Sequence, residues 1–364
     1  MSADLPEDDS EIVTPLTEQQ AHAFWQALIV RLPALEALDG HDFVEQANDL
    51  LQEHAQGLAI ELIGKAGAAG SGLVISAHGN TAQFENVQTL VRHAPHFEHY
   101  AVAAFRSRTL GADFAMRMDK FELSSSDVLV GYYNAGGITG LELAFAKEIP
   151  QDMASHAQHM AFIMLDHILG EWDFSVRVGP VEFVDAISQG MNGPVPLPQL
   201  PPAFDAFVRD VLGRTYEYPK EADGRWSSLE IRSRDAGEDD APDILSFHES
   251  ANAVATRADL SHFVEWRFPF ASQEDLDAAR DAQDALDEEL ARQQRGILVF
   301  SRVENMNSRV AAFYVDDAAY ATALAQQLGA QNAPDLQAEL SVSYDPAWNE
   351  YLSLYAAIHR QDEE

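Results

Sequence analysis

The chain has 364 residues, 23 of them Lys or Arg and 59 of them Asp or Glu, which gives a formal net charge of −36. This charge argues against direct binding to nucleic acid, whose phosphates it would repel, and against adsorption to an anionic membrane. The sequence holds no cysteine, which excludes disulfides, thiolate catalysis and cysteine-ligated zinc. Hydrophobic residues make up 46% of the chain, enough for packed cores, and the length suggests two domains of about 100–200 residues each.

The negative charge is divided evenly along the chain. Residues 1–190 hold nine basic and 27 acidic residues, a net charge of −18, and residues 191–364 hold 14 basic and 32 acidic residues, again −18. Acidity is therefore a property of both halves rather than of one tail. Two interpretations stay open, an acidic surface that binds a partner or a composition adapted to a salty cytoplasm.

The sequence predicts a cytoplasmic protein. The N-terminus has neither the basic region nor the apolar region of a signal peptide. No apolar run approaches the ~20 residues that span a bilayer, so no membrane partner is expected. Residues 1–14 and 359–364 are polar and acidic, and we expect solvated tails there, the first of them disordered.

The first half, residues 15–185, is predicted to be an α+β domain that opens with a pair of helices. Thr17 is the predicted cap of a helix over 18–37, whose apolar residues follow helical spacing. The remaining predicted elements, in chain order, are a helix over 42–55, strands over 58–63 and 73–77, a helix over 82–93, strands over 100–106, 113–123, 127–134 and 140–146, a helix over 151–170 and a strand over 174–184.

Proline-rich residues 186–202 are predicted to be a semi-rigid linker between the two halves. Beyond it, a second domain is expected over 203–358. Its predicted elements, in chain order, are a helix over 203–212, strands over 226–232 and 244–249 around an acidic loop 235–242, a strand over 262–270, a helix over 273–294 capped by Ser272, strands over 296–303 and 309–316, a helix over 317–329 and a strand over 337–343.

The last six of these elements follow the order β-α-β-β-α-β, which is typical of a ferredoxin-like split βαβ sandwich. The first half shows the same order with extra strands before its second helix. We therefore predict the α+β class, with two ferredoxin-like antiparallel-sheet sandwiches and helices on one face of each sheet. The first sandwich would carry the extra strands and the N-terminal helical pair.

A final helix is predicted to begin at Asp345, with Asp345 as its cap and Pro346 in its first turn. Trp348 and Tyr351 would then share one helix face. Packing against the domain is the first interpretation of this face, and an aromatic stripe that binds a partner is the alternative.

Motifs that would name a reaction are missing from the sequence. The glycine-rich run 64–72 carries Lys65 at the wrong end for a phosphate-binding loop and leads into a predicted strand instead of a helix. No nucleophile elbow occurs, and paired carboxylates mean little in so acidic a chain. We therefore predict no catalytic residue and no cofactor.

Histidines and arginines supply the remaining candidates. His156, His159 and His167 lie on one predicted helix and are weak metal candidates, although a half-buried helix face explains them as well. Arg267 and Arg309 lie on predicted strands, Arg267 beside Trp266. Each arginine is expected either to extend its charged group to the solvent or to pair with a carboxylate on the sheet, and Arg309 facing a ligand groove is the alternative. With Trp348 and Tyr351 they form the candidate partner-binding set.

The segments Gly296–Val303, Arg309–Asp317 and Asp345–Tyr351 resemble a bacterial family of domains of unknown function, numbered six-nine-five, over about residues 225–355. The residues that carry this resemblance are Arg309, Phe313, Tyr314, Asp345, Pro346 and Trp348, which fall in the order expected of the family. That family is similar in fold to the protein regulator B of ribonuclease E activity, another small acidic ferredoxin-like protein. The first half resembles the extra domain of some bacterial relatives. The resemblance implies no enzyme, and at most the binding and regulation of another protein.

Three hypotheses for the function follow. The first is a non-enzymatic regulatory or interaction protein whose acidic faces bind a basic protein partner. The second is an enzyme of unrecognised class with a site between the two domains, for which the three histidines and Arg309 are the first candidates. The third is a salt-adapted scaffold whose acidity serves solubility alone.

Overall fold

The described residues of the computed structural model are 13–111, 113–118, 121–220, 224–232 and 241–360. Most of the predicted tails 1–14 and 359–364 lies outside the described residues, and so does most of the acidic loop 235–242. No helix within the described ranges combines the length and the apolar character that crossing a bilayer requires.

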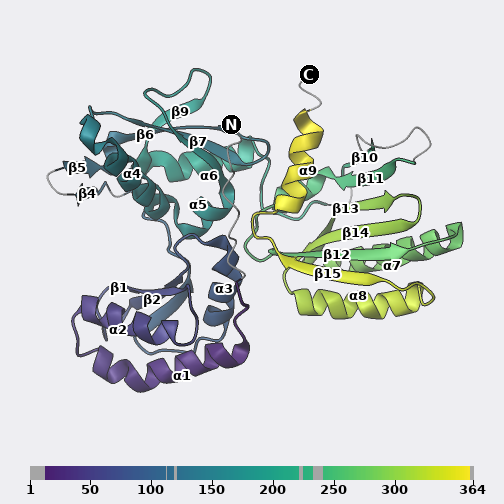
Figure 1. The fold of residues 1–364 in the computed structure, drawn as a ribbon, viewed down its shortest axis with the longest axis horizontal. Coiled ribbons are helices and arrows are strands. Elements are labelled where there is room, and N and C mark those ends of the chain that lie inside the picture. Colours follow the sequence, from purple (N-terminus) through teal and green to yellow (C-terminus); the bar gives the residue numbers. More distant parts are fainter. Residues whose placement is uncertain (1–12, 112, 119–120, 221–223, 233–240, 361–364) are drawn as a thin grey trace, which may run out of the picture. The chain divides into compact units, whose positions relative to one another are not determined.

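The chain is a mixed α+β protein with several sheets (Figure 1). It divides into two compact units, residues 1–112 with 159–175, and residues 113–158 with 176–364. This division differs from the predicted one, in which a single linker over 186–202 separates an N-terminal from a C-terminal domain.

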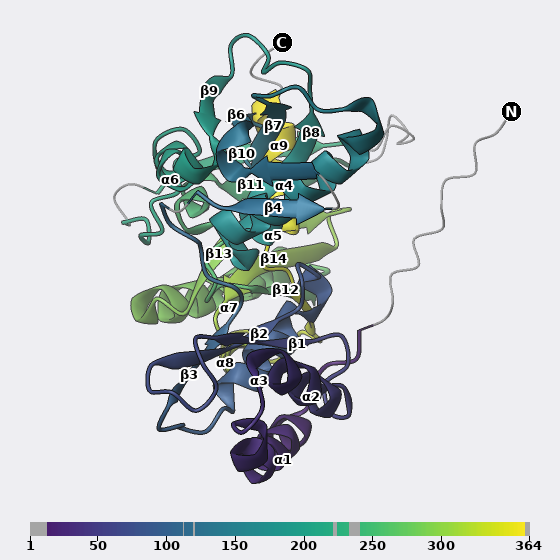
Figure 2. The ribbon, with the colours of Figure 1, turned by 90° about the vertical axis from the view of Figure 1, so that its left-hand side faces the viewer.

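The first unit contains a three-stranded sheet in the order β1-β2-β3 with helices beside it (Figure 2). Its elements are α1 (Glu18–Leu35), α2 (Gly40–Gln52), β1 (Ala59–Ile63), β2 (Ser71–Ser76), α3 (Phe84–Arg92), β3 (Tyr100–Ala104), most of α4 (Ala154–Leu169) and most of α5 (Glu171–Arg177). The predicted cap of α1 is confirmed, because the Thr17 hydroxyl accepts the N–H of Gln20. β1 and β2 are antiparallel, whereas β2 and β3 are parallel, since α3 makes the crossover between them.

Glu171 ties three backbone segments of this unit together. Its side chain is 0% exposed, and its carboxylate accepts the N–H groups of Ala77 at 2.8 Å, Gly79 at 3.1 Å and Arg106 at 3.1 Å. The Arg106 guanidinium in turn pairs with Glu61 at 2.6 Å. Glu171 lies between the helix predicted over 151–170 and the strand predicted over 174–184, and residues 174–177 are helical where that strand is predicted.

The second unit begins with a β4–β5 hairpin and a four-stranded sheet in the order β8-β7-β6-β9. These strands are β4 (Ala115–Met118), β5 (Phe121–Ser124), β6 (Val128–Asn134), β7 (Thr139–Phe145), β8 (Val178–Phe183) and β9 (Asn192–Pro196). β7 and β8 are parallel, because the long connection through α4 and α5 permits a crossover. The antiparallel sandwich predicted for the first half is therefore wrong in two respects: its strands form separate sheets, and two strand pairs are parallel.

The predicted linker 186–202 takes part in this sheet. β9 pairs with β6, and α6 (Leu200–Asp210) begins before the linker was expected to end. β9 lies at the edge of the sheet, where the missing N–H groups of prolines are tolerated. The prolines therefore mark an edge strand and a helix start.

The rest of the second unit is a six-stranded antiparallel sheet in the order β10-β11-β13-β14-β12-β15. Its elements are β10 (Trp226–Ile231), β11 (Asp243–His248), β12 (His262–Pro269), α7 (Gln273–Gln293), β13 (Gly296–Glu304), β14 (Ser308–Val315), α8 (Ala318–Asn332), β15 (Glu339–Tyr344) and α9 (Asn349–Arg360). The β-α-β-β-α-β order predicted for residues 262–343 is confirmed element by element.

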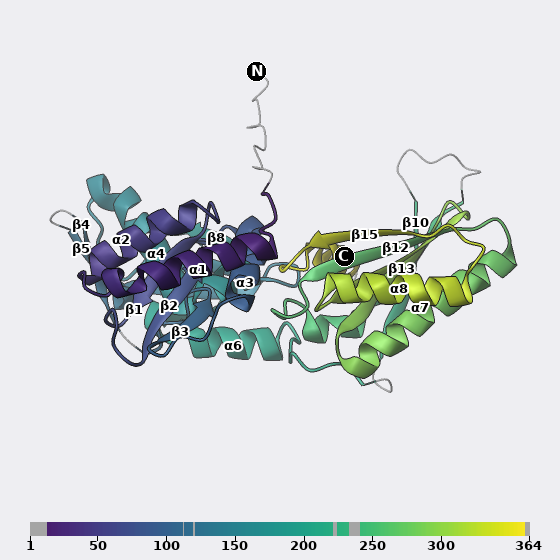
Figure 3. The same cartoon turned by 90° about the horizontal axis from the view of Figure 1, so that it is seen from below.

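Helices cover both faces of this sheet. Ala311, Phe313 and Val315 of β14 pack in the core beneath α7 and α8, which lie side by side across the sheet (Figure 3). The alternate residues Ala312 and Tyr314 belong to a second core, which α9 covers. The prediction of helices on one face is therefore incomplete, because α9 packs on the other.

α9 begins later than predicted. Trp348 has φ +58°, which lies outside the helical region, so the first helical residue is Asn349. The Asp345 carboxylate nevertheless accepts the N–H of Glu350 at 3.1 Å and the phenol of Tyr314 at 2.6 Å. Asp345 thus caps the helix from a distance and anchors it to β14.

Candidate functional site

An exposed row of carboxylates runs along α7 and forms the strongest candidate site. Its members, which we call the α7 acidic stripe, are Glu274, Asp277, Asp281, Asp284 and Glu288. They are spaced alternately three and four residues apart, so they lie on one face of the helix. At 1.5 Å per residue the row extends over about 21 Å.

The opposite face of α7 explains why this stripe points outward. The buried residues Ala279, Ala282, Leu286 and Leu290 repeat at helical spacing and pack on the sheet. At the start of the helix, the predicted Ser272 capping box is confirmed. Apolar burial thus fixes the rotation of the helix, and the carboxylates take the solvent side.

The stripe is only partly neutralised. α7 carries eight acidic and two basic side chains, a net charge of −6. Arg280 pairs with Asp277 at 3.2 Å, and the other arginine of the helix pairs outside the stripe. Within the described residues, Glu274, Asp281 and Glu288 form no ion pair. Negative potential therefore concentrates along one helix face.

Arg309 lies beneath this helix. It is 9% exposed, and its Nη2 donates to the Gln283 side chain at 2.8 Å and to the Ser301 hydroxyl at 3.2 Å. Burial lowers the pKa of Arg309 to about 10, and the positive charge of Arg280 lowers it further, while Asp284 opposes this shift. The expected pairing with a sheet carboxylate is wrong for Arg309, since its partners are an amide and a hydroxyl. Its position under α7 also keeps it out of an open groove.

The neighbouring candidates Arg267 and Trp266 divide between surface and core. Arg267 bonds Glu304 and pairs with Glu265 at 3.0 Å, as expected for an arginine on a sheet face. Trp266 is 1% exposed, and its ring lies 4.5 Å from that of Phe268 in the core under α8. Trp266 is therefore a packing residue with no surface for a partner.

Trp348 and Tyr351 are also core residues. The Trp348 ring stacks on Tyr314 with 3.9 Å between centroids, and its indole N–H donates to the Leu260 carbonyl at 2.7 Å. Tyr351 stacks on Phe247 at 4.8 Å. Both side chains are 0% exposed, which confirms the packing interpretation and contradicts the partner-binding stripe.

The histidine candidates do not come together. His156 and His159 are exposed on α4, contrary to the half-buried face expected for them, and His167 is half-buried. In the described part of the chain, the group whose ligand atoms approach within 4.8 Å of one another is His41, Asp42 and Glu45. All three of these side chains are exposed, and nothing else there indicates a metal site.

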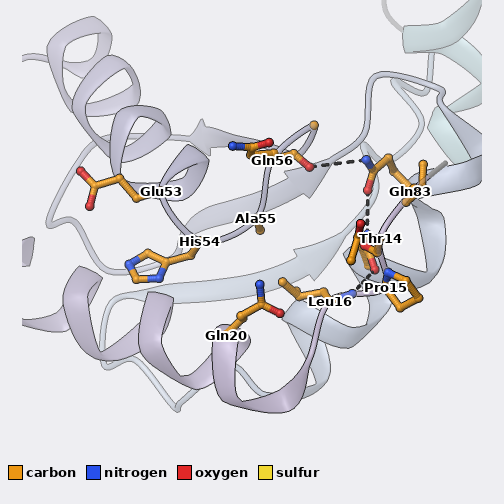
Figure 4. A pocket seen from close by; sticks show the side chains of 12 residues that line it. Thr14, Pro15, Leu16, Gln20, Glu53, His54, Ala55, Gln56 and Gln83 are labelled. Atoms are coloured by element: carbon orange, nitrogen blue, oxygen red, sulfur yellow. Dashed lines mark hydrogen bonds between the residues drawn. The ribbon is translucent and has the colours of Figure 1, made fainter. Parts of the chain in front are cut away.

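A hollow of about 570 Å³ lies between residues 13–16, residues 53–57 and the start of α3 (Figure 4). Its amide groups are mostly bonded within the protein: the Asn86 side chain donates to Gln83 at 2.8 Å and accepts the N–H of Leu16 at 2.7 Å. Among the described residues that line it, Glu53 is the one carboxylate. These bonds hold the entry segment of α1 in place and present no converging reactive groups.

No protein-family model, curated protein or solved structure matches the chain. The assignment of the candidate site therefore depends on the geometry of the structure alone. The sequence contains the signal for the α7 acidic stripe, namely carboxylates at the same helical spacing as the apolar face, but the runs of adjacent acidic residues conceal it.

Proposed function

We propose that the chain is a non-enzymatic regulatory or interaction protein of the bacterial cytoplasm, and that it binds a basic protein partner through the α7 acidic stripe. The observation that carries this proposal is the alignment of five exposed carboxylates on one rigid helix, three of them without an ion pair in the described residues. A helix backed by a packed core presents them at fixed positions.

The geometry specifies the partner's chemistry. Successive carboxylates are about one helical turn, ~5 Å, apart, so a complementary surface needs Arg or Lys groups at a similar interval over about 21 Å. A basic amphipathic helix or the basic rim of a nucleic-acid-binding protein meets this requirement. Charge complementarity of this kind mainly determines association rate and partner choice.

The fold of the C-terminal half supports a regulatory role. The order β12-α7-β13-β14-α8-β15, with strands arranged β13-β14-β12-β15, is the arrangement expected of a ferredoxin-like sandwich with β10 and β11 added at one edge. We propose this fold for residues 262–344. The resemblance to domains related to the ribonuclease E regulator then points to the same class of activity, the binding of another protein.

The test measures binding of a fluorescent helical peptide whose arginines alternate three and four residues apart. Anisotropy titrations compare the full chain with the triple variant Glu274→Gln, Asp281→Asn, Glu288→Gln. Three exposed ion pairs of about 0.5 kcal/mol each predict a loss of about tenfold in affinity. The dependence of affinity on salt concentration is expected to flatten as well.

A matched control removes three charges from α2, an exposed helix of the other unit: Asp42→Asn, Glu45→Gln, Asp49→Asn. This variant has the same net charge as the stripe variant, and we expect wild-type affinity. Equal weakening by both variants would mean that overall charge attracts the peptide, which would overturn the proposal. Binding that is insensitive to salt would also overturn it.

A further inference from the structure

The outer side of β15 is a sheet edge that lacks the usual protection against pairing with another chain. β15 is the last strand in the order of the six-stranded sheet and pairs with β12 on its inner side. Its sequence contains no proline and no lysine, and its pairing with β12 has no bulge. Prolines, lysines and bulges are the features that commonly keep edge strands from associating. The edge strand β9, by contrast, carries two prolines.

The register with β12 shows which residues of β15 turn their backbone groups toward this edge. The N–H of Asp345 donates to the carbonyl of Ser261 at 2.8 Å, so these two residues form a hydrogen-bonded pair. In an antiparallel ladder such pairs alternate with pairs whose N–H and C=O groups point away from each other. Ser341 therefore directs its backbone groups to β12, whereas Leu340 and Val342 direct theirs to the outer side.

The side chains of Leu340 and Val342 lie on the face of the sheet that α7 and α8 cover. Leu340 packs against the core beneath these helices, and Val342, two residues further along the strand, points to the same face. Val342 remains 46% exposed. The edge therefore combines outward backbone groups with an exposed apolar side chain.

The part of the chain that forms this edge carries little charge, although the net charge of the protein is −36. α8 contacts β12, the neighbour of β15, and none of its 15 residues is charged, whereas α7 beside it carries ten charged side chains. Over residues 318–344 only Asp335 and Glu339 are charged. A second copy of the chain is repelled by an acidic surface, and at the β15 edge this repulsion is small. The composition of the edge therefore favours another copy of the chain over a basic partner.

We propose that two copies of the chain associate through antiparallel pairing of their β15 strands, about a two-fold axis at Ser341. In this register Leu340 of each copy faces Val342 of the other, and each such pair exchanges two backbone hydrogen bonds. Apolar side chains then lie opposite each other, and Glu339 faces Ser343 rather than another carboxylate. The axis is perpendicular to the sheet, so both α7 acidic stripes lie on the same side of one continuous sheet. The pairing is independent of what α7 binds, and either proposal can fail without the other.

Sedimentation equilibrium of the full chain over a range of concentrations tests the association. We expect a dimer whose dissociation constant falls as salt screens the repulsion between two acidic copies. Binding of the basic peptide to α7 should instead weaken with salt, so the two effects have opposite signs. A chain that stays monomeric at every concentration and salt would overturn the proposal, and would leave the edge to an extended segment of a different protein.

A charge at the edge tests whether β15 is the interface. Val342→Lys places an ammonium group opposite Leu340 of the other copy, and it should raise the dissociation constant at least about tenfold although it lowers the net negative charge. Val342 is exposed, so thermal unfolding of the dilute variant should match that of the wild-type chain. The control Ser228→Lys makes the same change of charge at an exposed position of β10, the opposite edge strand, and should dimerise as wild type. Unchanged association of Val342→Lys, or equal loss in Ser228→Lys, would refute the assignment.

The absence of cysteine from the chain allows the register to be tested with one introduced thiol. Ser341→Cys places this thiol at the axis, where the two Cα atoms of a non-hydrogen-bonded pair are about 4.5 Å apart, within disulfide range. Ser343→Cys is the matched control on the same strand face, because its two Cα atoms would be about 14 Å apart, four residues along the strands. In a thiol–disulfide buffer, Ser341→Cys should form a cross-linked dimer on a non-reducing gel and Ser343→Cys should not. Equal cross-linking of both variants, or none of Ser341→Cys, would contradict the proposed pairing.

Discussion

Asp287 provides a pH-dependent test of how α7 packs on the sheet. Unlike the stripe residues, it is partly buried, and its Oδ1 accepts the N–H of Leu298 at 3.2 Å. Burial raises the pKa of Asp287 from 3.8 to about 6; the hydrogen bond from Leu298 opposes this shift and the charge of Asp284 reinforces it. Replacement by Asn keeps an acceptor oxygen for Leu298 and removes the charge, so we expect Asp287→Asn to stabilise the protein at neutral pH.

The sign and size of this effect follow from the two protonation equilibria. Below the unfolded pKa of 3.8, Asp287 is protonated in both states and contributes nothing. As the pH rises toward the folded pKa of about 6, the unfolded chain loses its proton first, and the free energy of unfolding falls. Above that pKa the loss is complete. Two pKa units correspond to about 3 kcal/mol, and loss of the charged acceptor lowers the net gain to about 2 kcal/mol.

Urea unfolding at a series of pH values between about 5 and 7.5 measures this difference. The gain of Asp287→Asn over wild type should grow by about 1.4 kcal/mol per pH unit up to about pH 6 and then level off. Asp281→Asn, an exposed substitution on the same helix, serves as control and should stay within about 0.5 kcal/mol of wild type at every pH. A gain that does not change with pH, or a loss at pH 7.5, would refute the burial argument.

Two further substitutions test buried contacts in the two units. Glu171→Gln weakens three charge-assisted bonds from backbone N–H groups and should lower the free energy of unfolding by about 2–3 kcal/mol in urea titrations; a change below about 0.5 kcal/mol would show that those bonds are not formed. Trp348→Phe keeps an aromatic ring on Tyr314 but leaves the buried Leu260 carbonyl unpaired, and it should cost about 1–3 kcal/mol by the same measurement. Wild-type stability of Trp348→Phe would contradict the assignment of Trp348 to the core.

The sequence predicts the C-terminal half well because its local signals agree with each other. Ser272 caps α7, apolar residues repeat at helical spacing after it, and the two strands that follow, β13 and β14, are apolar runs that are buried almost throughout. Where local preferences agree with tertiary packing in this way, the sequence pattern predicts the secondary structure correctly. The start of α9 is the exception, because Trp348 has a left-handed backbone and its ring stacks on Tyr314, a residue far away in the sequence.

The first half is harder to predict because strand pairing there depends on long connections. The strand predicted over 73–77 is found as β2 (Ser71–Ser76), but nothing in its sequence indicates whether its neighbour across α3 is parallel. The prolines at 194 and 196 suggest a linker in the sequence, but they belong to the edge strand β9, which pairs with β6. Similarly, Asp281 and Asp287 are the same residue type on the same helix. Only the packing of the helix leaves Asp281 as an exposed charge and buries Asp287 enough to raise the pKa of its carboxyl group.

The α7 acidic stripe also affects the stability of its helix, and this effect distinguishes a role in binding from a role in folding. Like charges three or four residues apart on a helix destabilise it by about 0.2–0.5 kcal/mol per pair, so four successive neighbours cost about 1–2 kcal/mol before Arg280 offsets a part. If the stripe served folding, its charges would instead make a favourable contribution to the free energy of unfolding. Neutralising Glu274, Asp281 and Glu288 should therefore leave the free energy of unfolding unchanged or raise it, while binding of the basic peptide weakens. Suppose instead that this variant and the α2 control both become less stable than the wild-type chain as salt is added. The acidity would then serve adaptation to salt, and the proposed partner-binding role of α7 would fail.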